Sequence, residues 1–290
     1  MSESSDGNQI DLFLENLVGT RLRDDRILME FPFFSIQKQP LMTPLIYQDG
    51  AVAVRVSPGE KGIATIWDKD VLIYLTSLIN AKIERGEPVS RTLTIAAHDM
   101  LKATGRPSGK TAYQEIYDAL FRLRSTTITT DIASAGTKEV RGFGWIDSFR
   151  ILSHINRAGR EVMKGLEITL NDWTFRALVQ DRRVLAINPR YFELTRGLER
   201  RLYEIARKHC GRQSSWKIGL ANLATKCGSQ QSNLRRFKFE LKSIIEADRI
   251  PDYQLVLLND HSSPLGRDLG VRGAGRAPNQ AVLVAVTPRV

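Results

Sequence analysis

The chain has 290 residues, 42% of them hydrophobic, and a formal net charge of +10 at pH 7. This length suits about two globular domains, each large enough to bury its own core. No stretch approaches the roughly 18 apolar residues of a membrane span, and the polar, acidic start of the chain lacks the pattern of a secretion signal. We therefore expect a cytosolic protein with no membrane partner.

The residue types that most often build metal or redox sites are sparse. Cys210 and Cys227 are too few and too far apart in sequence for a ligand cluster, and a reducing compartment does not favour a disulfide between them. We expect both to be packing residues. The four histidines stand apart from one another, whereas a nicking enzyme needs paired histidines to hold a metal beside a nucleophilic tyrosine. The sequence therefore indicates no catalytic centre and no cofactor.

The first elements of the chain are a hairpin and a long helix. Residues 1–25 are expected to be loosely ordered. Residues 43–56 alternate in hydropathy around Asp49-Gly50, a dipeptide that favours a tight turn, and this pattern predicts two antiparallel strands. A long helix follows, with Asp68 as its expected cap and Gly86 near its end.

A strand and two helices come next. The strand is predicted at 92–95, and a helix over 98–103 stops at Gly105. Thr111 and Gln114 have the spacing of a capping box, which predicts the start of a third helix at this point.

Further strands are predicted at 125–131, 141–152 and 165–170, and they resemble the wing of a winged-helix domain. The segment 105–111 looks like a phosphate-binding loop, but three residues separate its glycines where the motif needs four. It also follows a helix rather than a strand. We therefore expect no ATPase activity.

The same order of elements recurs in the second half. A cap-then-proline signal at 188–189 starts a helix. The interval from Ile95 to Gly105 equals that from Ile218 to Gly228, which is ten residues in each case. The later elements are predicted at 198–209, 215–218, 220–241, 253–258 and 281–286. We therefore predict an α+β protein with two tandem winged-helix domains, 26–185 and 186–290, each a helical core with a small antiparallel sheet.

The segment 220–241 has the pattern of a helix-turn-helix. Leu220, Leu223 and Ala224 recur at the spacing of one buried helix face, and Gly228 permits the left-handed backbone of a tight turn. The apolar stripe of the second helix consists of Leu234, Phe237, Leu241, Ile244 and Ile245. Basic side chains fall on or beside the opposite face, which suits a DNA major groove.

Amide and guanidinium groups at the start of such a helix have the geometry to bind base edges, and lysines further along can meet phosphates. The candidate base-contacting residues are Gln230, Gln231, Ser232, Asn233, Arg235 and Arg236. The other candidate DNA-binding residues are Lys238 and Lys242 on the same helix, Arg267, Arg272 and Arg276 in the glycine-rich loop after residue 258, and Lys110 in the first domain.

Two simpler interpretations stay open. The helix pair can be an ordinary amphipathic hairpin with a solvated charged face, and the loop can be a flexible surface loop. The charge distribution favours DNA: residues 1–185 hold 24 Lys and Arg against 23 Asp and Glu, whereas residues 186–290 hold 18 against 9. Positive charge concentrated beside a helix-turn-helix is typical of a protein that binds the phosphate backbone.

With these residues described, the chain resembles the bacterial plasmid replication initiator protein A family, theta-type initiators with tandem winged-helix domains. Its markers are Leu28-Met29-Glu30 with Pro32-Phe33-Phe34-Ser35, and the segments 62–74, 141–149 and 198–211. Phe31 departs from the pattern, since a histidine is expected there.

The resemblance implies that the protein binds repeated sites, iterons, in double-stranded origin DNA, melts the DNA locally and recruits a host initiator and replicative helicase. It also implies a homodimer in equilibrium with monomer, and the dimer can repress its own promoter. In that scheme the C-terminal domain makes most base contacts, and the N-terminal domain handles dimerisation and backbone contacts. A dedicated transcriptional repressor and a nicking initiator are the alternative functions.

Overall fold

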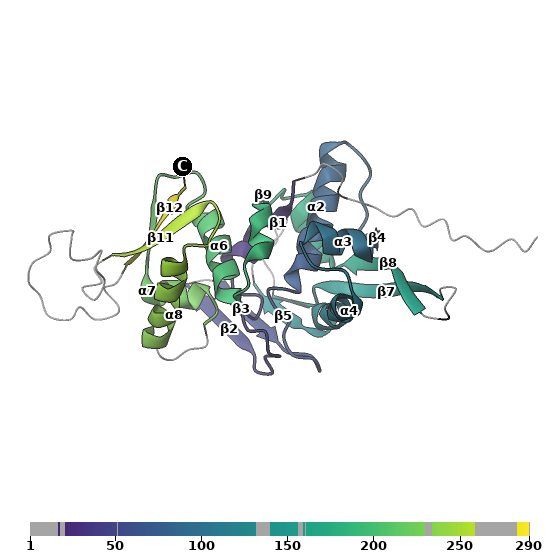
Figure 1. Ribbon diagram of the computed structural model, residues 1–290, viewed down its shortest axis with the longest axis horizontal. Helices are drawn as coiled ribbons and strands as arrows, with labels where there is room; N and C mark the ends of the chain where they lie inside the picture. The colour runs from purple at the N-terminus through teal and green to yellow at the C-terminus, as the bar shows by residue number, and fades with distance from the viewer. Residues whose placement is uncertain are drawn as a thin grey trace, which may run out of the picture.

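The computed structural model contains two hydrophobic cores that meet along a shared segment near the N-terminus. In Figure 1 helix α6 lies near the middle, with α7, α8 and the last strands on one side and α2, α3 and α4 on the other. The described residues are 17, 21–50, 52–131, 140–155, 159, 161–229, 234–258 and 283–289.

The first core is built around α2, a helix that is buried on nearly all sides. The hairpin beside it shows the expected alternation, because Leu45 and Tyr47 are buried while Ile46 is exposed. The elements of this core are β2 (Leu45–Asp49), β3 (Val52–Ser57), α2 (Lys69–Glu84), β4 (Thr92–Ala96), α3 (Ala97–Ala103), α4 (Lys110–Ser125), β5 (Thr127–Thr130), β6 (Arg141–Phe143), β7 (Ile146–Ile155), β8 (Glu161–Leu170) and α5 (Asp172–Val179).

The second core is built around α6, which is buried along most of its length. Cys210 and Cys227 are both buried in this core as free thiols, in agreement with their predicted packing role. The elements of this core are η1 (Pro189–Glu193), α6 (Gly197–His209), β10 (Trp216–Gly219), α7 (Leu220–Lys226), α8 (Leu234–Ala247), β11 (Tyr253–Leu258) and β12 (Leu283–Pro288).

The two halves of the chain contain sheets of the same topology. In the first, the strand order is β4-β8-β7, and in the second it is β10-β12-β11. In each sheet, the strand that comes last in sequence therefore lies in the middle, and the other two strands pair with it on either side. All of these pairs are antiparallel. The predicted α+β class with two tandem units and small antiparallel sheets is thus confirmed.

A short segment near the N-terminus joins the two units. Strand β1 (Arg23–Asp25) pairs antiparallel with β9 (Val184–Ala186), directly before the second unit. Helix α1 (Arg26–Glu30) follows, begun by the Asp25 carboxylate, which accepts a hydrogen bond from Ile27 N at 2.6 Å. Leu28 packs in the first core and Met29 in the second, so this helix contributes to both.

Three local expectations need correction. Residues 23–25, expected to be loosely ordered, form the paired strand β1. Asp68 lies at the start of α2 but does not cap it, because its carboxylate accepts from Thr65 N and pairs with Arg122, each at 2.7 Å. The capping box at Thr111 and Gln114 is wrong, since α4 begins at Lys110 after an extended glycine with no side-chain cap.

Within the ranges that the structure describes, no helix is both long and apolar enough to cross a membrane.

Candidate nucleic-acid interface

Helices α7 and α8 form the helix-turn-helix predicted at 220–241. Leu220, Leu223 and Ala224 are the buried residues of α7. Gly228, after α7, has a φ of +66°, and a Cβ at this position would lie 2.7 Å from the Pro32 side chain. Glycine is therefore required here for two reasons, its left-handed backbone and the close approach of the N-terminal segment.

Helix α8 separates an apolar face from a basic one. Phe237, Leu241 and Ile244 pack into the second core, while Arg235 and Arg236 are exposed near the start of the helix. The lysines at 238 and 242 are half-buried at the edges of the exposed face. The structure therefore brings four candidate DNA-binding residues to one helix, with the two arginines in the most accessible positions.

The other candidates are distributed differently. Lys110 is exposed as the first residue of α4, in the first unit. The rest lie outside the described residues, namely Gln230, Gln231, Ser232, Asn233, Arg267, Arg272 and Arg276.

Helix α4 is the counterpart of α8 in the first unit, and its outer face carries acidic groups. Glu115 is exposed, and Asp118 is half-buried and forms an ion pair with Lys61. Further along the helix, Arg122 is held by the buried Asp68 carboxylate at 2.7 Å. With Lys110 exposed at its start and Arg124 exposed near its end, α4 therefore carries a surface of mixed charge, whereas Arg235 and Arg236 lie together on α8.

Arg201 of α6 joins the helix-turn-helix to the N-terminal segment. Its guanidinium donates to the carbonyls of Met29 at 2.9 Å and Glu30 at 2.8 Å, and also to the Lys226 carbonyl at 2.9 Å. These carbonyls lie at the C-terminal ends of α1 and α7, where the backbone acceptors have no partner within their own helix. One buried cation therefore fixes the first helix of the pair against the segment that both units share.

A buried group of charges lies beside Arg201. The Lys69 ammonium of α2 is fully buried between the carboxylates of Asp24 at 2.6 Å and Glu204 at 2.8 Å. Glu204 also accepts from Arg201 at 2.9 Å and from the Tyr191 hydroxyl at 2.8 Å. These contacts connect β1, α2, η1 and α6, so they hold the two units in one relative orientation.

Burial and charge act in opposite directions on the two carboxyls. Burial raises the pKa of Asp24 to about 7, although the Lys69 ammonium opposes the shift. Burial acts in the same sense on Glu204, but Lys69 and Arg201 outweigh it and lower the pKa of that carboxyl. At the same junction, Asp70 of α2 forms an ion pair with Arg200 of α6 at 2.7 Å.

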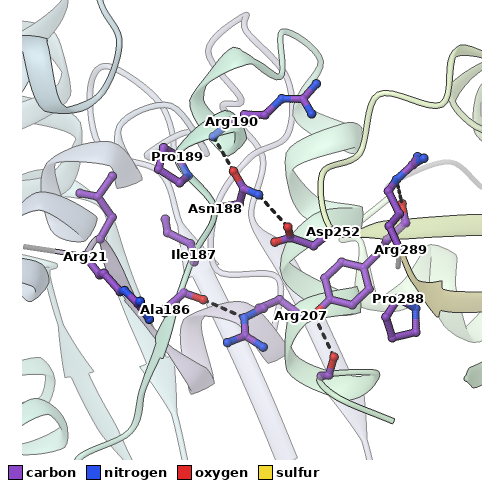
Figure 2. Close-up of a pocket in the computed structure, with 13 residues that line it drawn as sticks. Arg21, Ala186, Ile187, Asn188, Pro189, Arg190, Arg207, Asp252, Pro288 and Arg289 are labelled. Atoms are coloured by element: carbon purple, nitrogen blue, oxygen red, sulfur yellow. Dashed lines mark hydrogen bonds between the residues drawn. The ribbon is translucent and has the colours of Figure 1, made fainter. Parts of the chain in front are cut away.

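A cavity of about 890 Å³ lies where β9 and η1 meet α6, β11 and β12 (Figure 2). Figure 2 shows the Asn188 side chain between Arg190 and Asp252, whose carboxylate accepts from Asn188 Nδ2 at 2.6 Å. Arg207 donates from Nε to the Ala186 carbonyl at 2.7 Å. These polar groups bind the chain's own backbone and side chains, so they attach the connecting segment to the second unit.

Sequence reasoning missed the buried charges and one exposed aromatic residue. Asp24, Lys69 and Glu204 are far apart in sequence, and no local pattern predicts that they meet. Phe239 on α8 is 78% exposed, beside the two arginines. Its signal was present, because it lies out of phase with the apolar stripe formed by Phe237 and Leu241.

Comparisons with known proteins agree with one another. The family model "Replication initiator protein A" matches residues 23–255. A "Putative replication protein" of Wigglesworthia glossinidia brevipalpis is 36% identical over 235 residues, which cover 80% of this chain and 84% of that protein.

Two solved structures are similar to this chain. Domains 2 and 3 of RctB align over 91% of this chain and 96% of that one, with a TM-score of 0.59 and 13% identity. The Pi initiator protein in complex with iteron DNA aligns over 77% and 90%, with a TM-score of 0.47 and 14% identity. At this level of identity, the likeness to RctB shows a shared fold.

Proposed function

The chain belongs to the replication initiator protein A family, and from this premise we propose that it starts plasmid replication by binding repeated double-stranded sites, iterons, at the origin. In this proposal both units act as winged helices, and the second unit selects the sequence. The protein carries out this role in the cytoplasm and catalyses no reaction on the DNA.

The observation that carries the proposal is the exposed basic face of α8. Arg235 and Arg236 lie in the first turn of this helix, where the residues of a recognition helix meet base edges. A guanidinium can bind the O6 and N7 atoms of guanine with two hydrogen bonds. Lys238 and Lys242 lie half-buried at the margins of this face, and we assign them to phosphates.

The buried charges around Lys69 support a fixed spacing between the two units. Two units that approach one face of B-DNA in a fixed orientation meet grooves about one helical turn apart. Because this repeat is ~10.5 base pairs, we expect each bound site to span roughly 20 base pairs. Lys110, exposed at the start of α4, is the proposed phosphate contact of the first unit.

The steps after binding are inferred from family membership. We propose that bound protein melts the adjacent DNA and recruits a host initiator and the replicative helicase. We also propose that a homodimer, in equilibrium with the monomer, represses the promoter of the protein's own gene.

Footprinting of the full chain on the DNA that flanks its own gene tests the proposal. We expect tandem protected repeats, each of roughly 20 base pairs. A variant with both Arg235→Ala and Arg236→Ala serves as the binding-deficient comparison. Both side chains are exposed, so their removal leaves the core intact. A single protected operator, together with failure of the protein to sustain an origin-bearing plasmid, would instead identify a transcriptional repressor.

A second assay addresses catalysis. Supercoiled origin DNA incubated with the protein and a divalent metal is expected to stay supercoiled. A relaxed or covalently linked product would identify a nicking enzyme and contradict the proposal.

A further inference from the structure

Helix α8 exposes a large aromatic side chain on the face proposed to meet DNA. Phe239 is 78% exposed, whereas Phe237, two positions earlier, is 1% exposed and packs in the second core. Successive positions in an α-helix differ by about 100°, so these two rings point in nearly opposite directions. The core of the protein therefore does not account for Phe239.

The neighbours of Phe239 on the helix surface are basic. Arg235 lies four positions earlier and Arg236 three positions earlier, and side chains at these spacings are adjacent on a helix, with Cβ atoms about 5–6 Å apart. The acidic residues of this helix are Glu240, which is half-buried, and Glu246, which is exposed near the opposite end. Phe239 is thus an apolar group next to the two most exposed cations of the helix.

An apolar group in this position has one matching feature in the DNA major groove. Among the base edges that the groove displays, thymine alone presents a methyl group, and Phe is one of the side chains that contact it. We propose that Phe239 packs against the methyl group of a thymine within the bound site and thereby selects thymine over cytosine at that position. This inference rests on the proposed function, because it requires α8 to enter the major groove.

The surroundings favour DNA over a protein partner. Protein-binding surfaces usually group several exposed apolar side chains. Among the described residues of α8, Phe239 is the one large hydrophobic side chain that is exposed. Two adjacent guanidiniums are attracted to the negative charge of a DNA duplex, so the charge complementarity points to DNA.

The test compares thymine with uracil, which lacks the methyl group and keeps the same hydrogen-bonding edge. The probe is a duplex that carries one protected repeat, with each thymine replaced in turn by uracil. For the wild-type chain, we expect one replacement to weaken binding about fourfold, the equivalent of about 0.8 kcal/mol for one buried methylene-sized group. For Phe239→Ala, the same replacement should leave the affinity unchanged, and Phe239→Leu should keep part of the preference.

The matched control is Ile155→Ala, which removes a side chain of similar exposure (75%) from β7, in the other unit. This variant should retain the full thymine preference, and both variants should melt at the wild-type temperature because both side chains lie outside the core.

Three outcomes would overturn the inference. The first is an equal uracil effect in the wild-type chain and in Phe239→Ala. The second is an altered oligomeric state of Phe239→Ala with unchanged discrimination, which assigns the ring to a protein contact. The third is failure of the wild-type chain to bind any site, which removes the proposed function as well, whereas the first two leave it intact.

Discussion

The two helix-turn-helix pairs, α3–α4 and α7–α8, share a backbone plan and differ in the chemistry of their outer faces. In both, a strand leads into a short helix and then a glycine with a φ near +65°, Gly105 in one and Gly228 in the other. The outer face of α8 presents Arg235 and Arg236, whereas that of α4 presents Glu115 and Asp118. Two related units can therefore keep one fold while their outer faces differ in charge.

Two basic residues of the first unit bind carboxylates within the protein. Arg106 and Arg122 are held by the buried carboxylates of Asp70 and Asp68. Their charges are neutralised within the protein, so they stabilise the junction and the helix packing. The location of basic residues in a sequence therefore does not by itself identify a DNA-binding surface, because residues such as Arg106 and Arg122 are held by buried carboxylates of the same protein.

The largest expected effect is a loss of stability, and it comes from disrupting the buried ion pairs that hold the two units together. Lys69→Met removes the cation between two buried carboxylates, and loss of one partner of a buried ion pair destabilises a protein by about 3–5 kcal/mol. Urea unfolding measures this loss. The matched control is Lys61→Met, which removes a partly exposed pair with Asp118 and should cost about 0–1 kcal/mol. Equal costs for the two variants would contradict a structural role for the buried charges.

The two turn glycines give the next largest effect and compare the pairs directly. Gly105→Ala meets only an ordinary contact 3.8 Å away, so its cost is the left-handed backbone, about 1–2 kcal/mol. Gly228→Ala has the same backbone cost and also places a methyl group 2.7 Å from the Pro32 side chain, which adds roughly 1–3 kcal/mol. In thermal unfolding, Gly228→Ala should melt at a lower temperature than Gly105→Ala. The reverse order would show that the segment around Pro32 moves away from the added methyl group at little cost.

Substitution of the outer faces tests their difference in DNA binding. Arg235→Ala or Arg236→Ala should lower the affinity for the specific site by about 1–3 kcal/mol and relax the preference at one base pair. Gln114→Ala, an exposed position on α4, should leave site discrimination unchanged. Affinities for specific and random duplexes supply the measurement. An equal loss on both kinds of DNA would assign the arginine to the phosphate backbone.

Single phosphate contacts are expected to have a smaller effect on affinity. Lys242→Ala on α8 and Lys110→Ala on α4 should each reduce the slope of log affinity against log salt by about one. A titration of binding against salt concentration measures both. If the slope changes for Lys242 alone, the first unit does not contact DNA through α4.

The smallest expected effect is a change of stability with pH, because the pKa shifts of Asp24 and His209 have opposite signs. Asp24 has a folded-state pKa raised to about 7 by burial, so the stability it contributes is lost as the pH rises from about 4 to 7. Burial lowers the pKa of His209 to about 4, in spite of the facing Glu30 carboxylate and with the help of Lys226 and Lys208. Its contribution is therefore present above about 6.5 and lost as the pH falls towards 4.

Two variants separate these contributions. Relative to the wild-type chain, Asp24→Asn should become more stable as the pH rises from 4 to 7, and His209→Gln should become less stable as the pH rises from 4 to 6.5. Melting temperatures across this range give the measurement. Parallel curves for the wild-type chain and both variants would show that neither group titrates as described.

Local patterns predicted most of the fold. The hairpin around Asp49-Gly50 and the α7–α8 pair follow from periodicity and glycine placement, and both are confirmed. The family resemblance is confirmed as well. Helix α5 was missed although its signals were present: Asn171 caps it by accepting from Thr174 N at 2.9 Å, and Trp173, Ala177 and Leu178 are buried on one face.

Long-range features were beyond local reasoning. Strand β1 is a three-residue, charged segment whose partner β9 lies about 160 residues later in the chain, so no alternation marks it. The ion pair between Lys69 and Glu204 is equally remote, with 135 positions between its members. For the candidate site, the basic face of α8 was predictable from the helical period, whereas the neutralisation of Arg106 and Arg122 depends on tertiary partners.

The segment of β1 and α1 has a consequence for how such proteins can be divided or recombined. Leu22 and Met29 complete the core of the second unit, and Pro32 packs against its turn glycine. A fragment cut at residue 186 would lack these side chains and expose the apolar surface that they cover. The second unit is therefore not an autonomous module, and a chimaera that exchanges reading units between relatives would have to carry the N-terminal segment with it.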